Sequence, residues 1–225
     1  MAAPLQLHLD VVSDVVCPWC YIGKRRLEGA IALTRGEVDV SVQWRPFFLN
    51  PWIPREGVDR KAYLETKFGS VDRYKGMASN VAAAAAEEGL EYNAAKINRQ
   101  PNTIDCHRLI YWAEPTGQSG ALKQRLMDLY FKDGADLTDP EVLVAAAADC
   151  GLPADETRAR LLSDLDVELI SQEAQTASDA GISGVPTFLL GGRYALSGAY
   201  PSEQLAKAIR HVASLPKEEV QPAAE

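Results

Sequence analysis

A Cys-x-x-Cys motif, Cys17-Pro18-Trp19-Cys20, lies where a strand-like segment meets a helix-like one. Proline is favoured at the first position of a helix, so Pro18 indicates that the helix begins directly after Cys17. A thiolate at that position faces the unpaired N–H groups and the positive end of the helix dipole, which favour its charged form. We therefore expect Cys17 to be an accessible nucleophile and Cys20 to resolve the mixed disulfide formed on Cys17.

The residues on both sides of the motif predict a strand-helix-strand unit. Apolar residues occupy every second position from Leu5 to Val11 and again from Val38 to Trp44, which is typical of strands with one buried face. Between them, the segment from Pro18 to Leu33 has the apolar spacing of a helix. Because a helical crossover joins them, the two strands should be parallel.

The rest of the chain predicts a helical insertion followed by a return to strands. Residues 46–59 have the prolines and glycine of an ordered loop, and the segments up to about residue 164 have only helical periodicity, so we expect no strand there. A helix at 167–181, strands at 187–190 and 193–197 joined by Gly191-Gly192, and a helix at 201–213 follow. This order predicts an α/β thioredoxin fold with an inserted all-helical domain: a discontinuous thioredoxin-like domain (1–55 and 165–215), the insertion (56–164) and a mobile tail (216–225).

The charge and hydropathy of the chain exclude two classes of partner. The net charge of −8 argues against a general phosphate-binding surface, so we expect no nucleic-acid partner. No apolar run approaches the length needed to span a membrane and no leader precedes the first strand, so we expect a cytoplasmic protein with no membrane partner.

Four cysteines in 225 residues are too few for a disulfide scaffold, so the close pair is expected to be catalytic or metal-binding. Zinc would need two further ligands, for which Cys106, His107 and Cys150 are the candidates. Cys106 and Cys150, however, lie on apolar stripes of predicted helices, where buried, inert thiols are expected. We therefore predict no metal site.

Further short motifs accompany the Cys-x-x-Cys segment along nearly the whole chain. They are Tyr21-Ile22-Gly23 directly after it, Phe48-Leu49-Asn50-Pro51, Asn102-Thr103 followed by His107, and Gly184-Val185-Pro186-Thr187-Phe188 followed by Ser197-Gly198. Together they resemble the DsbA-family thiol–disulfide oxidoreductases of the FrnE type, in the thioredoxin-like superfamily.

The resemblance implies a cis peptide bond between Val185 and Pro186, facing the two sulfurs. Val185 would then offer backbone hydrogen bonds to a substrate. Pro18 and Trp19 are expected to contact the substrate as well, with Trp19 as a partly exposed apolar surface.

Three polar residues near these motifs have alternative interpretations. Asn50 is a candidate substrate-binding residue, or it braces its loop. His107 either faces the cleft, where it would influence Cys17 and the substrate, or lies on the surface. Asp14 would raise the pKa of a nearby thiolate, so we assign it to capping the helix rather than to proton transfer.

These observations predict a dithiol–disulfide oxidoreductase that acts on protein or small-molecule disulfides. We expect no cofactor, with glutathione a candidate co-substrate, and the exposed insertion offers a surface for a homodimer.

The alternative is a glutathione-dependent isomerase or transferase related to 2-hydroxychromene-2-carboxylate isomerase and kappa-class glutathione transferase. Those enzymes typically have serine at the position of Cys17 and need no resolving thiol, so Cys20 argues against them. The direction of exchange and the redox potential are left open.

Overall fold

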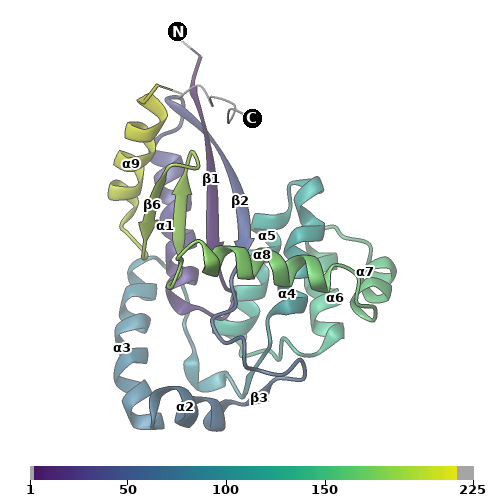
Figure 1. The fold of residues 1–225 in the computed structure, drawn as a ribbon. Coiled ribbons are helices and arrows are strands. Elements are labelled where there is room, and N and C mark those ends of the chain that lie inside the picture. The colour runs from purple at the N-terminus through teal and green to yellow at the C-terminus, as the bar shows by residue number, and fades with distance from the viewer. Residues whose placement is uncertain (1–2, 217–225) are drawn as a thin grey trace.

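The computed structural model describes residues 3–216, in which a four-stranded sheet lies beside a larger group of helices (Figure 1). The strands are β1 (Leu5–Ser13), β2 (Val38–Pro46), β3 (Val58–Asp59), β4 (Arg99–Gln100), β5 (Thr187–Leu190) and β6 (Tyr194–Ser197). The helices are α1 (Pro18–Leu33), α2 (Arg60–Phe68), α3 (Val71–Glu87), α4 (Ile104–Ala113), α5 (Ser119–Asp128), α6 (Pro140–Asp149), α7 (Ala154–Leu161), α8 (Val167–Asp179) and α9 (Ser202–Ser214). Short helical turns are η1 (Ala94–Lys96), η2 (Glu114–Thr116) and the π-helical η3 (Leu129–Asp133).

The main sheet has the strand order β2-β1-β5-β6. β1 and β2 are parallel, with Leu5 opposite Val38 and Ser13 opposite Pro46, as the helical crossover predicted. β5 is antiparallel to both β1 and β6. The predicted α/β thioredoxin fold is confirmed.

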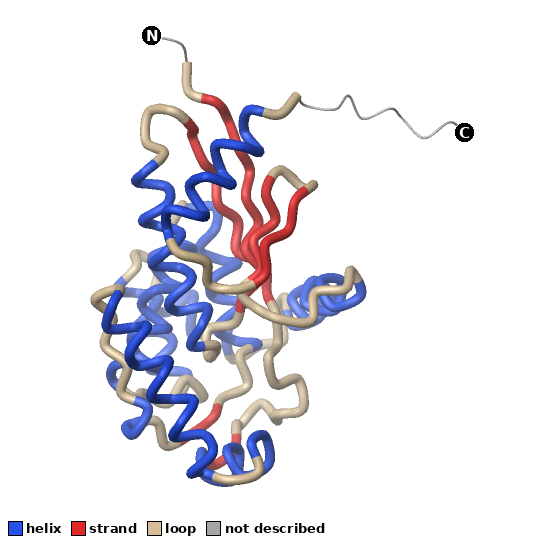
Figure 2. Tube along the Cα trace, turned by 90° about the vertical axis from the view of Figure 1, so that its left-hand side faces the viewer, coloured by secondary structure: helices blue, strands red, loops and turns tan. Residues whose placement is uncertain are grey.

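Two layers of helices enclose the sheet. Alternate residues of β1, including Leu7 and Leu9, are buried against apolar residues of α1 and α9 such as Leu27 and Ile209. α8 lies on the opposite side of the sheet and is seen nearly end-on in Figure 2. The two-residue period of β1 therefore fixes which face receives α1, and with it where the cysteines sit.

The prediction that residues 56–164 contain no strand is wrong. β3 and β4 form a short antiparallel ladder in which Val58 lies opposite Gln100 and Asp59 opposite Arg99. Strands of two residues are too short to produce an alternating pattern, and their pairing joins segments about 40 residues apart. The proposed division into domains stays a prediction, and residues 217–225 of the expected tail lie outside the described residues.

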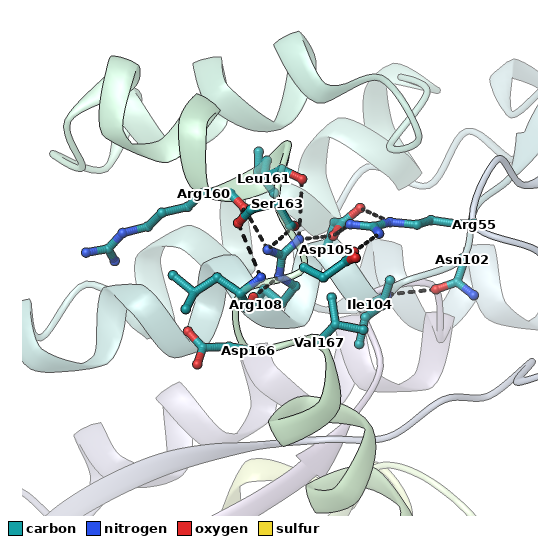
Figure 3. A network of polar contacts seen from close by, with 12 residues as sticks. Arg55, Asn102, Ile104, Asp105, Arg108, Arg160, Leu161, Ser163, Asp166 and Val167 are labelled. Carbon is teal, nitrogen blue, oxygen red and sulfur yellow. Dashed lines mark hydrogen bonds and ion pairs between the residues drawn. The ribbon is translucent and has the colours of Figure 1, made fainter.

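A buried arginine joins α4 to the segment between α7 and α8. Arg108 has an exposed fraction of 0%. Its guanidinium donates to Asp105 Oδ1 at 2.6 Å and to the backbone carbonyl oxygens of Leu165 at 2.7 Å, Arg160 at 2.7 Å and Ser163 at 2.8 Å (Figure 3). One side chain thus satisfies the carbonyl group of Arg160 in the last turn of α7 and those of Ser163 and Leu165 in the irregular segment that follows.

In residues 3–216, no helix has both the length and the apolar character required to cross a bilayer.

Candidate active site

Cys17 is the residue directly before α1, with an extended backbone (φ −88°, ψ 114°). Its carbonyl oxygen accepts the N–H groups of Cys20 at 3.0 Å and Tyr21 at 3.1 Å, so the helix begins at Pro18 as predicted. Within residues 3–216 the Cys17 side chain makes no capping hydrogen bond. As the residue that precedes the helix, Cys17 lies at the positive end of the dipole of α1.

The Cys17 thiol faces the loop that leads into β5. It donates to the carbonyl oxygen of Val185 at 3.5 Å, and the Val185–Pro186 peptide bond is cis. Gly23, one and a half turns along α1, lets the helix come this close: a Cβ on Gly23 would lie 2.8 Å from Pro186 Cγ. Glycine at position 23 thus allows α1 to pack against this loop, and this close contact is a physical reason for the glycine that ends the CPWCYIG segment.

Cys20 differs from Cys17 in its environment, although both are free thiols. Its exposed fraction is 2%. Burial raises the pKa of the Cys20 thiol well above its usual range, and the neighbouring Cys17 raises it further. A buried, protonated thiol is a poor first nucleophile but is suitably placed to attack a disulfide formed on Cys17.

Cys17 is more enclosed than the sequence led us to expect, with an exposed fraction of only 4%. It is reached through a cavity of about 320 Å³, whose walls include Cys17, Pro18, Trp19 and Val185 at one end and residues of α2 and α3 at the other. Trp19 is 41% exposed at this site, as expected, and its role as a contact surface for the substrate stays a prediction. The volume lies within the range of small-molecule sites.

Asp14 does not cap α1, so that assignment is wrong. The residue is fully buried and its Oδ2 accepts the N–H of Leu49 at 2.9 Å, while its Oδ1 lies 3.4 Å from His107 Nε2. Burial acts to raise the pKa of Asp14, but His107 and the Leu49 N–H lower it on balance. Asp14 is therefore ionised, and it ties the loop after β2 to α4 beneath the motif.

His107 is not on the surface, because its exposed fraction is 4%. Burial lowers the pKa of His107 more than the Asp14 carboxylate raises it, so the imidazole is neutral near pH 7. It is packed edge-on against Phe48 and is not among the residues that line the cavity. The polar contact of His107 in this structure is with the carboxylate of Asp14.

Asn50 is also buried, with an exposed fraction of 6%. Its Oδ1 accepts hydrogen bonds from Lys67 Nζ and, at 3.3 Å, from the hydroxyl of Tyr63. Of the two alternatives for Asn50, these contacts favour bracing: the side chain positions two residues that themselves line the cavity.

The remaining cysteines lie away from the motif in sequence and differ from each other. Cys106 is fully buried in α4, whereas Cys150 directly follows α6 as its C-terminal cap and is only partly buried, so the expectation of a buried thiol is wrong for Cys150. Within residues 3–216, no three His, Cys, Asp or Glu side chains are grouped closely enough to hold a metal ion.

Sequence reasoning missed Lys123, a residue of α5 that is 1% exposed. Its Nζ has no hydrogen-bond partner within residues 3–216 and lies 5.3 Å from the centroid of the Trp44 ring. Burial lowers the pKa of Lys123 to about 8. Its positive charge also lowers the pKa of Cys20, against the larger rise that burial causes. The charge of Lys123 thus favours the thiolate form of Cys20, although less than burial disfavours it.

The burial of Lys123 has a consequence for stability that depends on pH. Because its folded-state pKa is depressed, the unfolded chain binds more protons between about pH 8 and 10.5, so the native state gains stability as pH rises through that window. Lys123→Met removes the cost of the buried charge. We expect the substitution to be more stabilising at pH 7 than at pH 10, by about 2 kcal/mol.

Urea denaturation of reduced wild-type and variant protein at both pH values measures this difference. Lys75→Met, at an exposed lysine of α3, is the matched control and should show no such dependence on pH. An identical stability difference for Lys123→Met at pH 7 and pH 10 would contradict a buried, depressed lysine.

Comparison of the sequence and the fold with known proteins identifies the family of this chain. Residues 8–210 match the model of the DSBA-like thioredoxin domain family. The chain belongs to this family. Its structure is similar to the probable DsbA oxidoreductase SCO1869 from Streptomyces coelicolor, with 31% identity and a TM-score of 0.86 over 96% of this chain and 94% of that one.

More distant members of the fold differ in activity. A 2-hydroxychromene-2-carboxylate isomerase has 17% identity and a TM-score of 0.68 over 91% of this chain and 95% of that one. The cytosolic disulfide reductase DsbM from Pseudomonas aeruginosa, solved with glutathione, has 16% identity and a TM-score of 0.61 over 92% of this chain and 96% of that one. At these identities the likeness concerns the fold alone.

Proposed function

We propose that the protein is a dithiol–disulfide oxidoreductase in which Cys17 attacks and Cys20 resolves. The observation that carries this proposal is the position of the Cys17 sulfur: it lies at the N-terminus of α1, 3.5 Å from the carbonyl oxygen of Val185, and borders a cavity. Cys20 lies behind it as a buried thiol with a raised pKa. The two cysteines therefore have the different environments that the two steps require.

The exchange proceeds in two balanced steps. The Cys17 thiolate attacks one sulfur of the substrate disulfide, so that a bond forms between Cys17 and that sulfur while the other half leaves as a thiolate. Cys20, after losing its proton, attacks Cys17, which forms the Cys17–Cys20 disulfide and releases the second half as a thiolate. The substrate gains two electrons and the protein loses two. The two protons lost by Cys17 and Cys20 pass to solvent or nearby groups, and the two released thiolates take up two protons in turn.

Two thiol equivalents must then return the protein to its reduced form. We propose a glutathione-like thiol for this role, since a structure with the same fold, DsbM, was solved with glutathione. A reducing cytoplasm would keep the pair as the dithiol at rest, so we propose a cytoplasmic reductase of the FrnE type. The CPWCYIG and GVPTF segments support that subtype.

A single-turnover experiment tests the roles of the two thiols. Reduced protein is mixed with bis(2-hydroxyethyl) disulfide and no other thiol, and adducts are identified by mass spectrometry. We expect wild-type protein to release two thiols per molecule and to end as the intramolecular disulfide. Cys20→Ser should release one thiol and retain a mixed disulfide on Cys17, because the resolving nucleophile is gone.

Cys150→Ser is the matched control, since it removes the partly exposed cysteine that directly follows α6 and should behave as wild type. Failure of Cys20→Ser to accumulate the adduct would sink the proposed roles. A glutathione-dependent isomerase, by contrast, would lose nothing when Cys20 becomes serine, so retained isomerase activity in this variant would favour that alternative.

A further inference from the structure

We propose that the active-site cavity selects small disulfides that carry a carboxylate on an apolar body, with Arg60 and Lys67 as the pair that binds the carboxylate. This inference rests on the proposed function and names the substrate class of that same site. Arg60 and Lys67 lie seven residues apart on α2, which places both on the face that lines the cavity.

Arg60 is a half-buried cation with no carboxylate within salt-bridge distance among residues 3–216. Its guanidinium donates instead to the neutral oxygens of Gln100, of Tyr74 at 2.9 Å and of Tyr130 at 3.3 Å. It lies 5.1 Å from the ring centroids of both Tyr63 and Tyr74, and its buried Nε has no hydrogen-bond partner in the part of the chain that the structure describes. A buried charge without a counter-ion is costly, so an anion entering the cavity would be bound strongly there.

Lys67 is more exposed than Arg60 but has similar polar partners. Its Nζ donates to Asn50 Oδ1 and to the carbonyl oxygen of Leu49 at 3.4 Å, and among the described residues it too has no carboxylate within salt-bridge distance. Lys61, on another face of α2, is by contrast close to Glu65, at 4.0 Å. Of the three cations of α2, the two that line the cavity thus have no acidic partner among residues 3–216.

The other walls of the cavity suit a ring or another compact apolar group. They are formed largely by Phe68, Tyr74, Met77, Val81, Tyr92 and Phe131. Flat aromatic walls favour planar apolar ligands, and the tyrosine hydroxyls add a few polar contacts. A ligand that combines an apolar ring with a carboxylate would use both parts of this surface.

The position of the nucleophile favours a small disulfide over a protein. Cys17 is only 4% exposed and borders the same cavity as Arg60 and Lys67. A compact disulfide can enter the cavity, whereas a disulfide inside a folded protein must bring its surrounding chain. With its carboxylate held by α2, the entering disulfide would present a sulfur to Cys17, and the exchange steps given above would follow unchanged.

Two chromogenic disulfides of similar shape separate charge recognition from reactivity. 5,5′-Dithiobis(2-nitrobenzoate) has a carboxylate on each aromatic ring, whereas 4,4′-dithiodipyridine is uncharged at neutral pH. Stopped-flow absorbance gives the second-order rate constant for each probe. In a Cys20→Ser/Cys150→Ser background, each protein molecule undergoes the first exchange at Cys17 and releases one aromatic thiol.

The ratio of the two rate constants, anionic probe over neutral probe, is the quantity that tests the proposal. Adding Lys67→Met is expected to lower this ratio about tenfold, the equivalent of about 1.4 kcal/mol of lost charge-assisted binding. Lys67→Arg should restore most of the ratio. Arg60→Lys, which retains the charge but loses the forked donor, should lower it less than Lys67→Met does.

Lys75→Met is the control, because Lys75 is an exposed lysine of α3 that does not line the cavity. It should leave the ratio within twofold of the background. A ratio that stays within twofold in both Lys67→Met and Arg60→Gln would overturn the proposed carboxylate site. Absence of reaction with either probe would instead count against Cys17 as the nucleophile, so the two failures are distinguishable.

Discussion

Replacing Cys17 by serine is expected to reduce the rate of thiol–disulfide exchange to the level of buffer, a loss of more than about 10³-fold. A serine hydroxyl is not ionised near neutral pH, so the variant would lack the charged nucleophile that the N-terminus of α1 stabilises. Cys20 cannot replace it. Unlike Cys17 it is not among the residues that line the cavity, and burial holds the pKa of its thiol well above the usual range.

The measurement is the initial rate of bis(2-hydroxyethyl) disulfide reduction with glutathione as the reductant, after subtraction of the rate without protein. Cys150→Ser provides the control, because it removes a partly exposed thiol at the end of α6. If Cys17→Ser kept more than one tenth of the wild-type rate, another group would be the nucleophile and the proposed function would be wrong.

Replacing Arg108 by methionine is expected to cost about 3–5 kcal/mol of folding free energy, because it breaks a buried, charge-assisted hydrogen-bond network. Methionine fills a similar volume but donates no hydrogen bond. The carbonyl oxygens of Arg160, Ser163 and Leu165 would lose their donor, and Asp105 would lose one of its two arginine partners. The segment between α7 and α8 should then separate from α4 (Figure 3).

Urea denaturation followed by circular dichroism gives the free energy of unfolding. Arg158→Met is the matched control: Arg158 also bonds to carboxylates, Glu141 and Asp155, but on the surface, so its loss should matter far less. Arg108→Lys should be destabilised as well, since one ammonium group cannot donate to all four acceptors of the guanidinium. This variant can be measured if Arg108→Met does not fold. Equal stability of Arg108→Met and Arg158→Met would contradict this account.

Much of the fold was predictable because its signals are local. The alternation of β1 and β2 and the proline after Cys17 depend on neighbouring residues only. The same holds for the hairpin between β5 and β6: Gly191 and Gly192 have φ values of 58° and 69°, which glycine adopts without strain. These patterns predicted the sheet and the location of the motif to within a few residues.

The polar residues around the motif were less predictable. Lys123 is adjacent to Leu122 on an amphipathic helix and looks like a solvent-facing lysine. A signal was present, since Met127 and Tyr130 follow it at four and seven residues and are also buried. Their burial shows that this segment has a second apolar face. The face is recognised only in the folded protein, where α5 packs against α4 as well as α6.

The sequence by itself determined that a Cys-x-x-Cys pair opens a helix after a central strand, because that arrangement is encoded by adjacent residues. Only the tertiary structure decided which charges surround the pair. Arg60 and Lys67 line the cavity of Cys17, and Asp14 meets His107, because α2 and α4 bring these side chains to the motif from distant parts of the chain. Burial and the pairing of charges depend on such long-range packing, and no local pattern of residues encodes it.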